Sequence, residues 1–447
     1  MTTTSITNPP APGRRAAIIL SGGGARGAYE VGVLWYIFDD LTRLRGAPPK
    51  VDILCGTSVG AINACYLAAH LADPVLGLRR LVELWSELQL ARVLGFGFRQ
   101  VVGIPRLLIG GSADGLGLFD VTPMADLVQR EISWRAVSRC LRRHQLRALS
   151  VSCTEVSTGR TVVFMQTSPD LVIPDKAPPR TLFRADRIGP HHALASAAIP
   201  LLFPPVKIDD ELYLDGGLRQ NTPIAPALRL GATHVLAIGL SREVKGIQMR
   251  EDLRHPQARS PGAAFLLGKV LNAFLLDHID VDMDLLNRLN RVIEDGTHAF
   301  GDSFNAKLNG AAHRRGGEMY RYVDCLGIHP SEDIGRLANE HLKRGRLRGD
   351  PILTKRLFSL LDLGVDHEAD LASYLLFDGP FCRQLIEMGR ADAQARRDDL
   401  MRFFGEASEG GAGGGAEGDR PMGGEHDPSL EDTGTWDRTS GNFQIGT

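Results

Sequence analysis

Two apolar segments near the N-terminus each run into a turn of small residues and then into a helical pattern. The first, "AAIIL" (16–20), precedes "SGGGARG", and the second, "VDILC" (51–55), precedes "GTSVG". Short, continuous apolar runs of this kind are typical of buried strands. A strand, a tight turn and a helix, twice in succession, predict a parallel sheet covered by helices, because parallel neighbours need a crossover connection. We therefore expect an α/β fold in which the two turns lie at one edge of the sheet. Further strands are expected at 147–156, 160–166, 211–216 and 233–240.

The glycines of the first turn fit a nucleotide site poorly. Gly22, Gly24 and Gly27 match the G-x-G-x-x-G pattern of dinucleotide-binding folds. That pattern also needs an acidic residue at the end of the second strand, where it binds ribose. Here that strand ends in "ILCGTS", without an acid, and no Gly-Lys-Ser/Thr completes a phosphate-binding loop. We expect no nucleotide cofactor.

The second turn has the G-x-S-x-G pattern, formed by Gly56, Ser58 and Gly60 between a strand and a helix. This is the context of a nucleophile elbow, in which a sharp turn presents the serine hydroxyl above the sheet. Backbone N–H groups of the first turn, at the same edge, would then face the oxygen of a tetrahedral intermediate. The predicted oxyanion hole consists of Gly22, Gly23 and Gly24.

A serine nucleophile needs a neighbouring base. The stretch "ELYLDGGLRQNTP" places Asp215 at the end of an expected strand, followed by Gly216 and Gly217. Asp-Gly-Gly is also a common turn. This stretch alone supports a simple turn and a catalytic aspartate equally. Beside the two other motifs, the catalytic interpretation is favoured.

The three motifs together resemble the patatin-like phospholipases. In that family a glycine-rich turn with a following basic residue and glycine, here Arg26 and Gly27, precedes G-x-S-x-G and then Asp-Gly-Gly. The stretches 192–206 and 221–241 also resemble the family, and the resemblance covers roughly residues 16–330. It implies a three-layer α/β fold with a central, mostly parallel sheet flanked by helices, together with a C-terminal helical extension.

The resemblance also implies a function. Ser58 would be the nucleophile and Asp215 the base of a Ser–Asp dyad without a catalytic histidine. The substrates implied are lipids, in particular phospholipids or lysophospholipids, whose acyl esters are hydrolysed. Arg26 would lie beside the oxyanion turn, either binding a headgroup phosphate or making a structural contact, and Asn221 would brace the loop near Asp215.

Two alternatives remain open on the sequence. An esterase with a Ser-His-Asp triad needs a histidine after the acid in chain order, and several are available, among them His234, His278, His298 and His313. A non-catalytic, membrane-binding protein that retains the fold is the other alternative. It is suggested by the arginines of 134–149, which are Arg135, Arg139, Arg142, Arg143 and Arg147.

Composition divides the chain and excludes some functions. We expect a flexible lead over 1–14, a catalytic domain over 15–330, a helical region over 331–404 and a disordered tail over 405–447. The tail is rich in glycine and carries nine acidic residues against two arginines, so it cannot bury enough apolar surface to offset its ordering entropy. The formal net charge of −2 gives no field to attract nucleic acid.

The six cysteines and the N-terminus suggest a cytoplasmic protein that can bind membranes peripherally. The cysteines are scattered, with no C-x-x-C pair or Cys/His cluster, so neither disulfides nor a metal site is expected. The N-terminus lacks the apolar core of a signal peptide. No uncharged apolar run reaches the roughly 18 residues of a membrane span.

Overall fold

This computed structural model describes residues 13–93, 95, 119–200, 202–242, 279–315, 319–345, 369–405, 435–436 and 443–444. The predicted lead over 1–14 lies almost wholly outside these residues. Most of the predicted tail does so too, although within it β10 (Thr435–Trp436) pairs antiparallel with β11 (Phe443–Gln444).

A mixed sheet of nine strands forms the centre of the described structure. Its main path has the order β5-β4-β3-β2-β1-β8-β9, and β7 pairs with β3 and β6 beside that path. The strands are β1 (Ala16–Leu20), β2 (Ile53–Thr57), β3 (Ala148–Glu155), β4 (Thr161–Thr167), β5 (Thr181–Ala185), β6 (Val206–Ile208), β7 (Glu211–Asp215), β8 (His234–Ile238) and β9 (Asp324–Ile328).

The five strands from β3 to β9 along the main path run parallel, as the repeated strand–turn–helix pattern predicted. The register places Leu20 beside Gly56 and Gly56 beside Val151. The turns after β1 and β2 therefore leave the sheet at the same edge. The remaining pairings include antiparallel ones, β3 with β4 and β3 with β7, and the second of these brings in the acidic motif.

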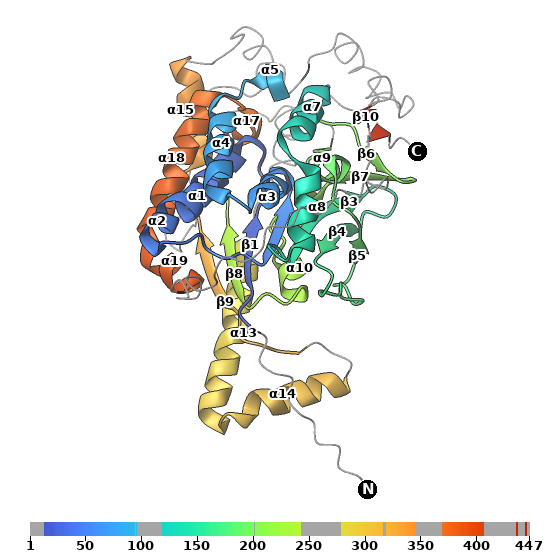
Figure 1. Cartoon of the computed structure of the whole chain (residues 1–447), viewed down its shortest axis with the longest axis vertical. Coiled ribbons are helices and arrows are strands. Elements are labelled where there is room, and N and C mark those ends of the chain that lie inside the picture. The colour runs from blue at the N-terminus through green and yellow to red at the C-terminus, as the bar shows by residue number, and fades with distance from the viewer. Residues whose placement is uncertain are drawn as a thin grey trace, which may run out of the picture.

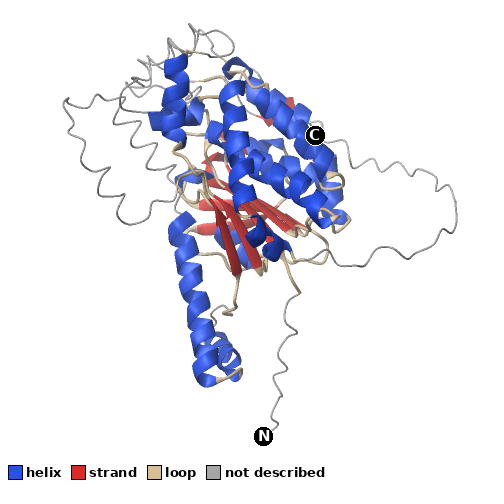
Figure 2. Ribbon diagram, turned by 90° about the vertical axis from the view of Figure 1, so that its left-hand side faces the viewer, coloured by secondary structure: helices blue, strands red, loops and turns tan. Residues whose placement is uncertain are grey.

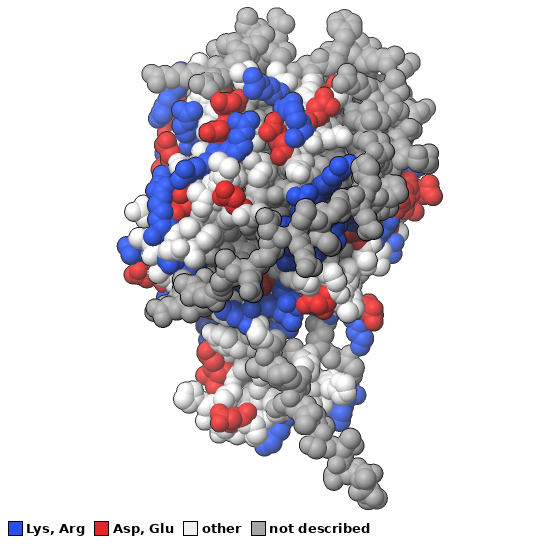
Figure 3. Space-filling model, viewed as in Figure 1, with Lys and Arg blue, Asp and Glu red and all other residues white. Residues whose placement is uncertain are grey.

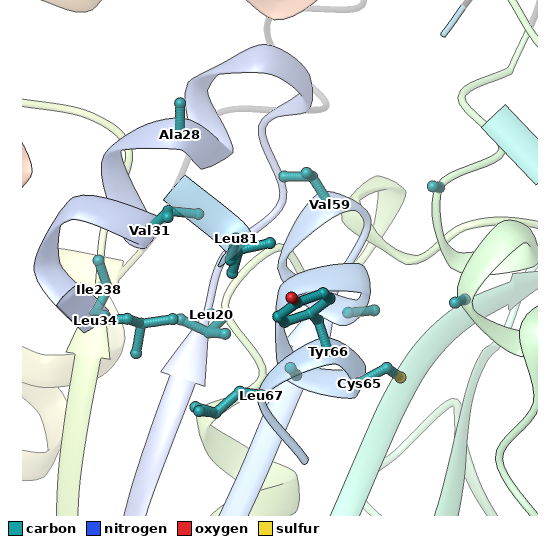
Figure 4. Close-up of a cluster of buried hydrophobic side chains, with 14 of the residues drawn as sticks. Leu20, Ala28, Val31, Leu34, Val59, Cys65, Tyr66, Leu67, Leu81 and Ile238 are labelled. Carbon is teal, nitrogen blue, oxygen red and sulfur yellow. The ribbon is translucent and has the colours of Figure 1, made fainter. Parts of the chain in front are cut away.

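Helices cover both faces of the sheet (Figures 1 and 2). Alternate side chains of β1 point to opposite faces of the sheet. Ile18 and Leu20 belong to one buried cluster. Ala17 and Ile19 belong to the other. The first cluster packs against α1 (Gly27–Trp35), α3 (Val59–His70), α4 (Pro74–Ser86), α9 (Pro190–Ser196) and α18 (Gly379–Ala395). Figure 4 shows the part in which side chains of α1 and α3 meet Leu20 and Ile238. The second cluster packs against α10 (Ile224–Arg229) and the start of α13 (Ile279–Phe300).

The remaining helical elements connect or extend this core. They are the 3-10 turns η1 (Gly24–Arg26) and η3 (Gly216–Leu218), the π-helical turn Tyr36–Asp40, α2 (Leu41–Arg45), α5 (Leu90–Val93), α7 (Thr122–Glu131), α8 (Trp134–Arg142), α14 (Ser303–Arg314), α15 (Ile334–Arg344), α17 (Ala369–Leu375) and α19 (Arg397–Phe404). Arg147 lies outside α8, which ends at Arg142, so the basic helix is shorter than the stretch 134–149.

The C-terminal helices pack directly on the first helix of the chain. A Cβ at Gly32 of α1 would lie 2.0 Å from the carbonyl oxygen of Ile386, and one at Gly389 of α18 would lie 2.2 Å from that of Tyr29. Only glycine allows the two backbones to approach so closely. In contrast, α13 and α14 extend away from the body (Figure 1). Asn290 of α13 donates a hydrogen bond to the carbonyl of Val323, which precedes β9, so this hairpin leaves the edge at which the parallel strands begin.

Candidate active site

Ser58 occupies a strained turn between β2 and α3. Its backbone has φ 54° and ψ −128°, a conformation that costs a non-glycine residue about 1–3 kcal/mol and is concentrated at functional sites. The flanking glycines make the turn possible. A Cβ at Gly56 would lie 2.5 Å from the carbonyl oxygen of Gly60, and one at Gly60 would lie 2.5 Å from that of Leu20. The turn thus has the geometry expected of a nucleophile elbow.

The glycine turn after β1 lies beside the elbow. A Cβ at Gly22 would lie 3.0 Å from the Cβ of Ser58. Gly24 has φ +56°, in the left-handed region that favours glycine. The N–H of Gly22 donates to the carbonyl of Asn221 at 3.2 Å, whereas the N–H groups of Gly23 and Gly24 have no partner among the described residues. Two of the three predicted oxyanion donors are therefore free to bind a ligand.

Asp215 reaches Ser58 because β7 pairs with β3, the neighbour of β2. Cys153 of β3 lies opposite Asp215 in this antiparallel pair. A Cβ at Gly216 would lie 2.2 Å from the carbonyl oxygen of Ser152, so the turn after Asp215 can follow β3 this closely only with glycine. The hydroxyl of Ser58 donates to Oδ2 of Asp215 at 2.6 Å, and the N–H of Gly217 donates to Oδ1 at 2.7 Å.

Burial controls the electrostatics of this pair. The Asp215 side chain is fully buried, and desolvation raises its pKa to about 7, although the hydrogen bonds from Ser58 and the Gly217 N–H favour the charged form. A carboxyl with a pKa near neutrality is suited to accept a proton and return it within one reaction cycle. This property depends on tertiary burial and was not expected from the sequence.

Hydrogen bonds from other elements hold the two motifs in place. The backbone N–H of Ser58 donates to the hydroxyl of Ser196, which in turn donates to the carbonyl of Ser152 at 2.6 Å. The hydroxyl of Thr154 donates to the carbonyl of Asp215 at 2.9 Å. Ser196 and Thr154 were missed by the sequence analysis, because a buried serine or threonine carries no distinctive local pattern.

Asn221, which was expected to brace the loop near Asp215, makes two hydrogen bonds with the glycine turn. Its Nδ2 donates to the carbonyl of Gly22 at 3.1 Å, while its own carbonyl accepts from the Gly22 N–H. The loop after Asp215 is thereby tied to the turn after β1.

Comparison with known proteins identifies the domain to which this site belongs. Residues 18–228 match the family model described as patatin-like phospholipase. This part of the chain is therefore similar to the patatin-like phospholipases. The matched range contains all three motifs and ends before β8, short of the 16–330 over which the motifs suggested a resemblance.

Two curated relatives are also similar to this chain. A "cGAMP-activated phospholipase" of Pseudomonas aeruginosa is 31% identical over 225 residues, which cover 46% of this chain and 53% of the relative. A "probable lipid hydrolase 463L" of Invertebrate iridescent virus 6 is 23% identical over 219 residues, covering 47% of this chain and 63% of the relative. The chain therefore spans about half to three fifths of the length of these relatives.

Among solved structures, VipD from Legionella pneumophila is 15% identical, with a TM-score of 0.28 and coverage of 71% of this chain and 61% of VipD. The ExoU–SpcU complex from Pseudomonas aeruginosa gives 16% identity, a TM-score of 0.23 and coverage of 87% and 72%. Scores this low do not establish a shared arrangement over the whole chain.

An apolar pocket opens beside Ser58. Its empty volume, which includes open solvent at the mouth, is about 850 Å³. The walls come from α3, α4, α7, the segment after α9 and the segment around α17. Apolar side chains that line it include Val59, Ile62, Tyr66, Leu81, Leu84, Trp85, Leu88, Val93, Met124, Leu127, Val128, Ile132, Ile199, Phe203, Tyr374, Leu375 and Phe377.

The pocket follows one face of α3, from Ser58 past Ile62 to Tyr66. At about 1.5 Å per residue, this length is roughly 12 Å. At roughly 1.2 Å per bond, an extended acyl chain of about ten carbon–carbon bonds has a similar length. A channel of this length and composition suits a lipid tail better than a small polar substrate.

Arg26 of the patatin-like motif is 5% exposed and points away from solvent. Its Nε donates to the hydroxyl of Ser373 at 2.6 Å, and its guanidinium lies 4.1 Å from the ring centroid of Tyr374. Of the two roles considered for Arg26, these contacts favour the structural one. Gly27 lies against α3, where a Cβ would meet a methyl group of Val59 at 2.7 Å.

No histidine among the described residues donates to or accepts from Ser58 or Asp215 through its side chain. His234 is the first residue of β8, at the edge opposite to Ser58, and His298 and His313 lie in the projecting α13 and α14. His278 lies outside the described residues. The buried His192 lies 3.4 Å from Asp186, and desolvation lowers the pKa of its imidazole.

Two features are absent from the part of the chain that the structure describes. None of its helices combines the length and the hydropathy that a membrane crossing requires. It also contains no group of three or more His, Cys, Asp or Glu side chains arranged to hold a metal ion.

Proposed function

We propose that this chain hydrolyses carboxylic esters of lipids, in the manner of a phospholipase A or a lysophospholipase, through an acyl-enzyme on Ser58. The observation that carries the proposal is the 2.6 Å hydrogen bond from Oγ of Ser58, which lines an apolar pocket, to a buried carboxyl with a pKa of about 7. A nucleophile, a base and a place for an acyl chain are thereby brought together.

The reaction would proceed in two balanced steps. Asp215 accepts the Ser58 proton while Oγ attacks the ester carbonyl, and the N–H groups of Gly23 and Gly24 stabilise the negative oxygen of the tetrahedral intermediate. The carbon–oxygen bond to the leaving group then breaks, and Asp215 returns the proton to the departing alkoxide. Water repeats the sequence on the acyl-enzyme, giving a fatty acid and free Ser58.

The pocket supports a long acyl chain as the part of the substrate that is recognised. Burial of a methylene group contributes about 0.8 kcal/mol, so a chain that fills the pocket binds much more tightly than an acetyl group. We therefore propose phospholipids or lysophospholipids with long acyl chains as substrates.

A peripheral contact with membranes is part of the same proposal. Arg135, Arg139, Arg142 and Arg143 are all exposed on or directly after α8, and a basic residue near an anionic bilayer contributes about 1 kcal/mol. The face in Figure 3 carries both signs of charge intermixed, so the attraction would be local. Binding to vesicles with anionic lipid should weaken as salt rises.

The central experiment is hydrolysis of mixed phospholipids by the purified chain and by Ser58→Ala. We expect fatty acid release by the wild type and its loss in the variant. Ser138→Ala is a matched control, because Ser138 is equally buried but accepts its hydrogen bonds from Gln166 and Arg187. A fluorophosphonate should label the wild type and the control, but not Ser58→Ala. Undiminished hydrolysis by folded Ser58→Ala would contradict the proposal.

A further inference from the structure

The C-terminal helix α17 lies directly against the glycine turn, although it is about 350 residues away in sequence. A Cβ placed on Gly24 would lie 2.2 Å from the carbonyl oxygen of Tyr374. The backbone of α17 therefore limits where Gly24 can lie. This contact joins the matched domain to a segment outside it.

A second contact ties the same turn to α17 through Arg26. The guanidinium stacks on the ring of Tyr374 with 4.1 Å between its central carbon and the ring centroid, and Nε donates to Ser373 at 2.6 Å. All three residues are buried. A buried cation is costly unless it is paired and hydrogen-bonded, so these contacts define one position for Arg26. Because Arg26 ends η1, which begins at Gly24, its position also defines the end of the glycine turn.

The same segment forms part of the wall of the pocket. Tyr374, Leu375 and Phe377 line it together with Ser58 and Gly24. Tyr374 thus contacts the turn with its carbonyl, Arg26 with its ring, and the space in which an acyl chain would lie.

We propose that residues 373–377 complete the active site, with Ser373 and Tyr374 as positioning residues that act through Arg26. They hold the N–H groups of Gly23 and Gly24 where the oxyanion develops. The inference rests on the proposed ester hydrolysis, and it assigns a role in the reaction to a segment outside the matched domain. A packing role alone would instead affect stability and the binding of long acyl chains.

The test is steady-state hydrolysis of a short-chain, water-soluble ester, which does not depend on filling the pocket. The variants are Arg26→Lys, which keeps the charge but not the planar fork, Tyr374→Leu, and the two combined. We expect each single variant to lower kcat by about 100-fold, the loss that a displacement of about 1 Å can cause, with little change in KM. If Tyr374 acts through Arg26, the two effects are not independent. The kcat of the double variant should then be no lower than that of the more impaired single variant.

Trp35→Leu is the matched control. Arg390 of α18 lies 4.2 Å from the Trp35 ring centroid, so this variant removes a similar stack between α1 and the C-terminal helices, without touching the glycine turn. It should lower the melting temperature and leave kcat unchanged. Ser373→Ala removes a single oxygen atom, so it can test the inference if the larger substitutions prevent folding. We expect it to lower kcat.

The outcomes separate this inference from the proposed function. Ser58-dependent hydrolysis with wild-type kcat in folded Tyr374→Leu or Ser373→Ala would overturn the inference and leave the proposed function standing. A rise in KM alone, or losses in kcat that multiply in the double variant, would also overturn it. Absence of any Ser58-dependent hydrolysis by the wild type would overturn both.

Discussion

The raised pKa of Asp215 makes a quantitative prediction about pH. If Asp215 is the base, only its ionised form can accept the Ser58 proton. With a pKa of about 7, about one hundredth of Asp215 is ionised at pH 5, so kcat/KM should be roughly 100-fold below its plateau there. The profile should reach half its maximum near pH 7. An exposed aspartate with its ordinary pKa would be fully ionised at both values.

The same pKa predicts how stability depends on pH. Unfolding returns Asp215 to its ordinary pKa of 3.8, below the folded value of about 7. The stabilising contribution of the bound proton is therefore fully present below about pH 4 and is lost as the pH rises to about 7. At roughly 1.4 kcal/mol per pKa unit, the whole difference corresponds to about 4 kcal/mol.

Asp215→Asn isolates this effect, because it keeps the shape of the side chain and removes its titration. The free energy of unfolding of the variant, relative to wild type, should increase by about 3 kcal/mol between pH 5 and pH 8. Urea denaturation at the two pH values measures this difference, and the variant should have almost no activity at either. A constant stability difference, or half-maximal activity near pH 4, would refute the reasoning.

Three further predictions concern the glycine turns and the pocket. Gly24→Ala places a Cβ against the Tyr374 carbonyl and should lower kcat by about 100- to 1000-fold by displacing an oxyanion donor; unchanged turnover would exclude Gly24 from the oxyanion hole. Ile62→Trp should narrow the pocket, so that long-chain esters lose kcat/KM while acetyl esters keep it; an equal loss for both would contradict an acyl channel. Gly60→Ala should destabilise the fold by about 1–3 kcal/mol in urea denaturation, because the new methyl group overpacks against β1. The control Gly310→Ala should be neutral or stabilising, because the added Cβ would have only the tip of an arginine side chain within 4 Å. Equal losses of stability in the two variants would contradict the steric account.

Local sequence was sufficient for the two turns and the strands that lead into them. β1 coincides with the predicted 16–20, and β2 begins two residues after the start of the predicted 51–55. The reason is steric: the turn requires Gly56 and Gly60, and these two residues lie so close together in the sequence that a local pattern reveals them. The short or half-exposed strands β5, β6 and β9 were not predicted, because their pairing partners, rather than their own residues, stabilise them.

The tertiary structure decided how the parts meet. The antiparallel pairing of β7 with β3 brings Asp215 to Ser58 across 157 residues, and no local pattern records such a pairing. Burial then moves the pKa of Asp215 from that of an ordinary carboxyl to one near neutrality, since desolvation depends on everything packed around the group. The contact of Tyr374 with Arg26 and Gly24 has the same origin. The sequence by itself determined which chemical groups and turns were available, because sterics act between neighbouring residues, whereas distance and dielectric environment arise only when distant segments pack together.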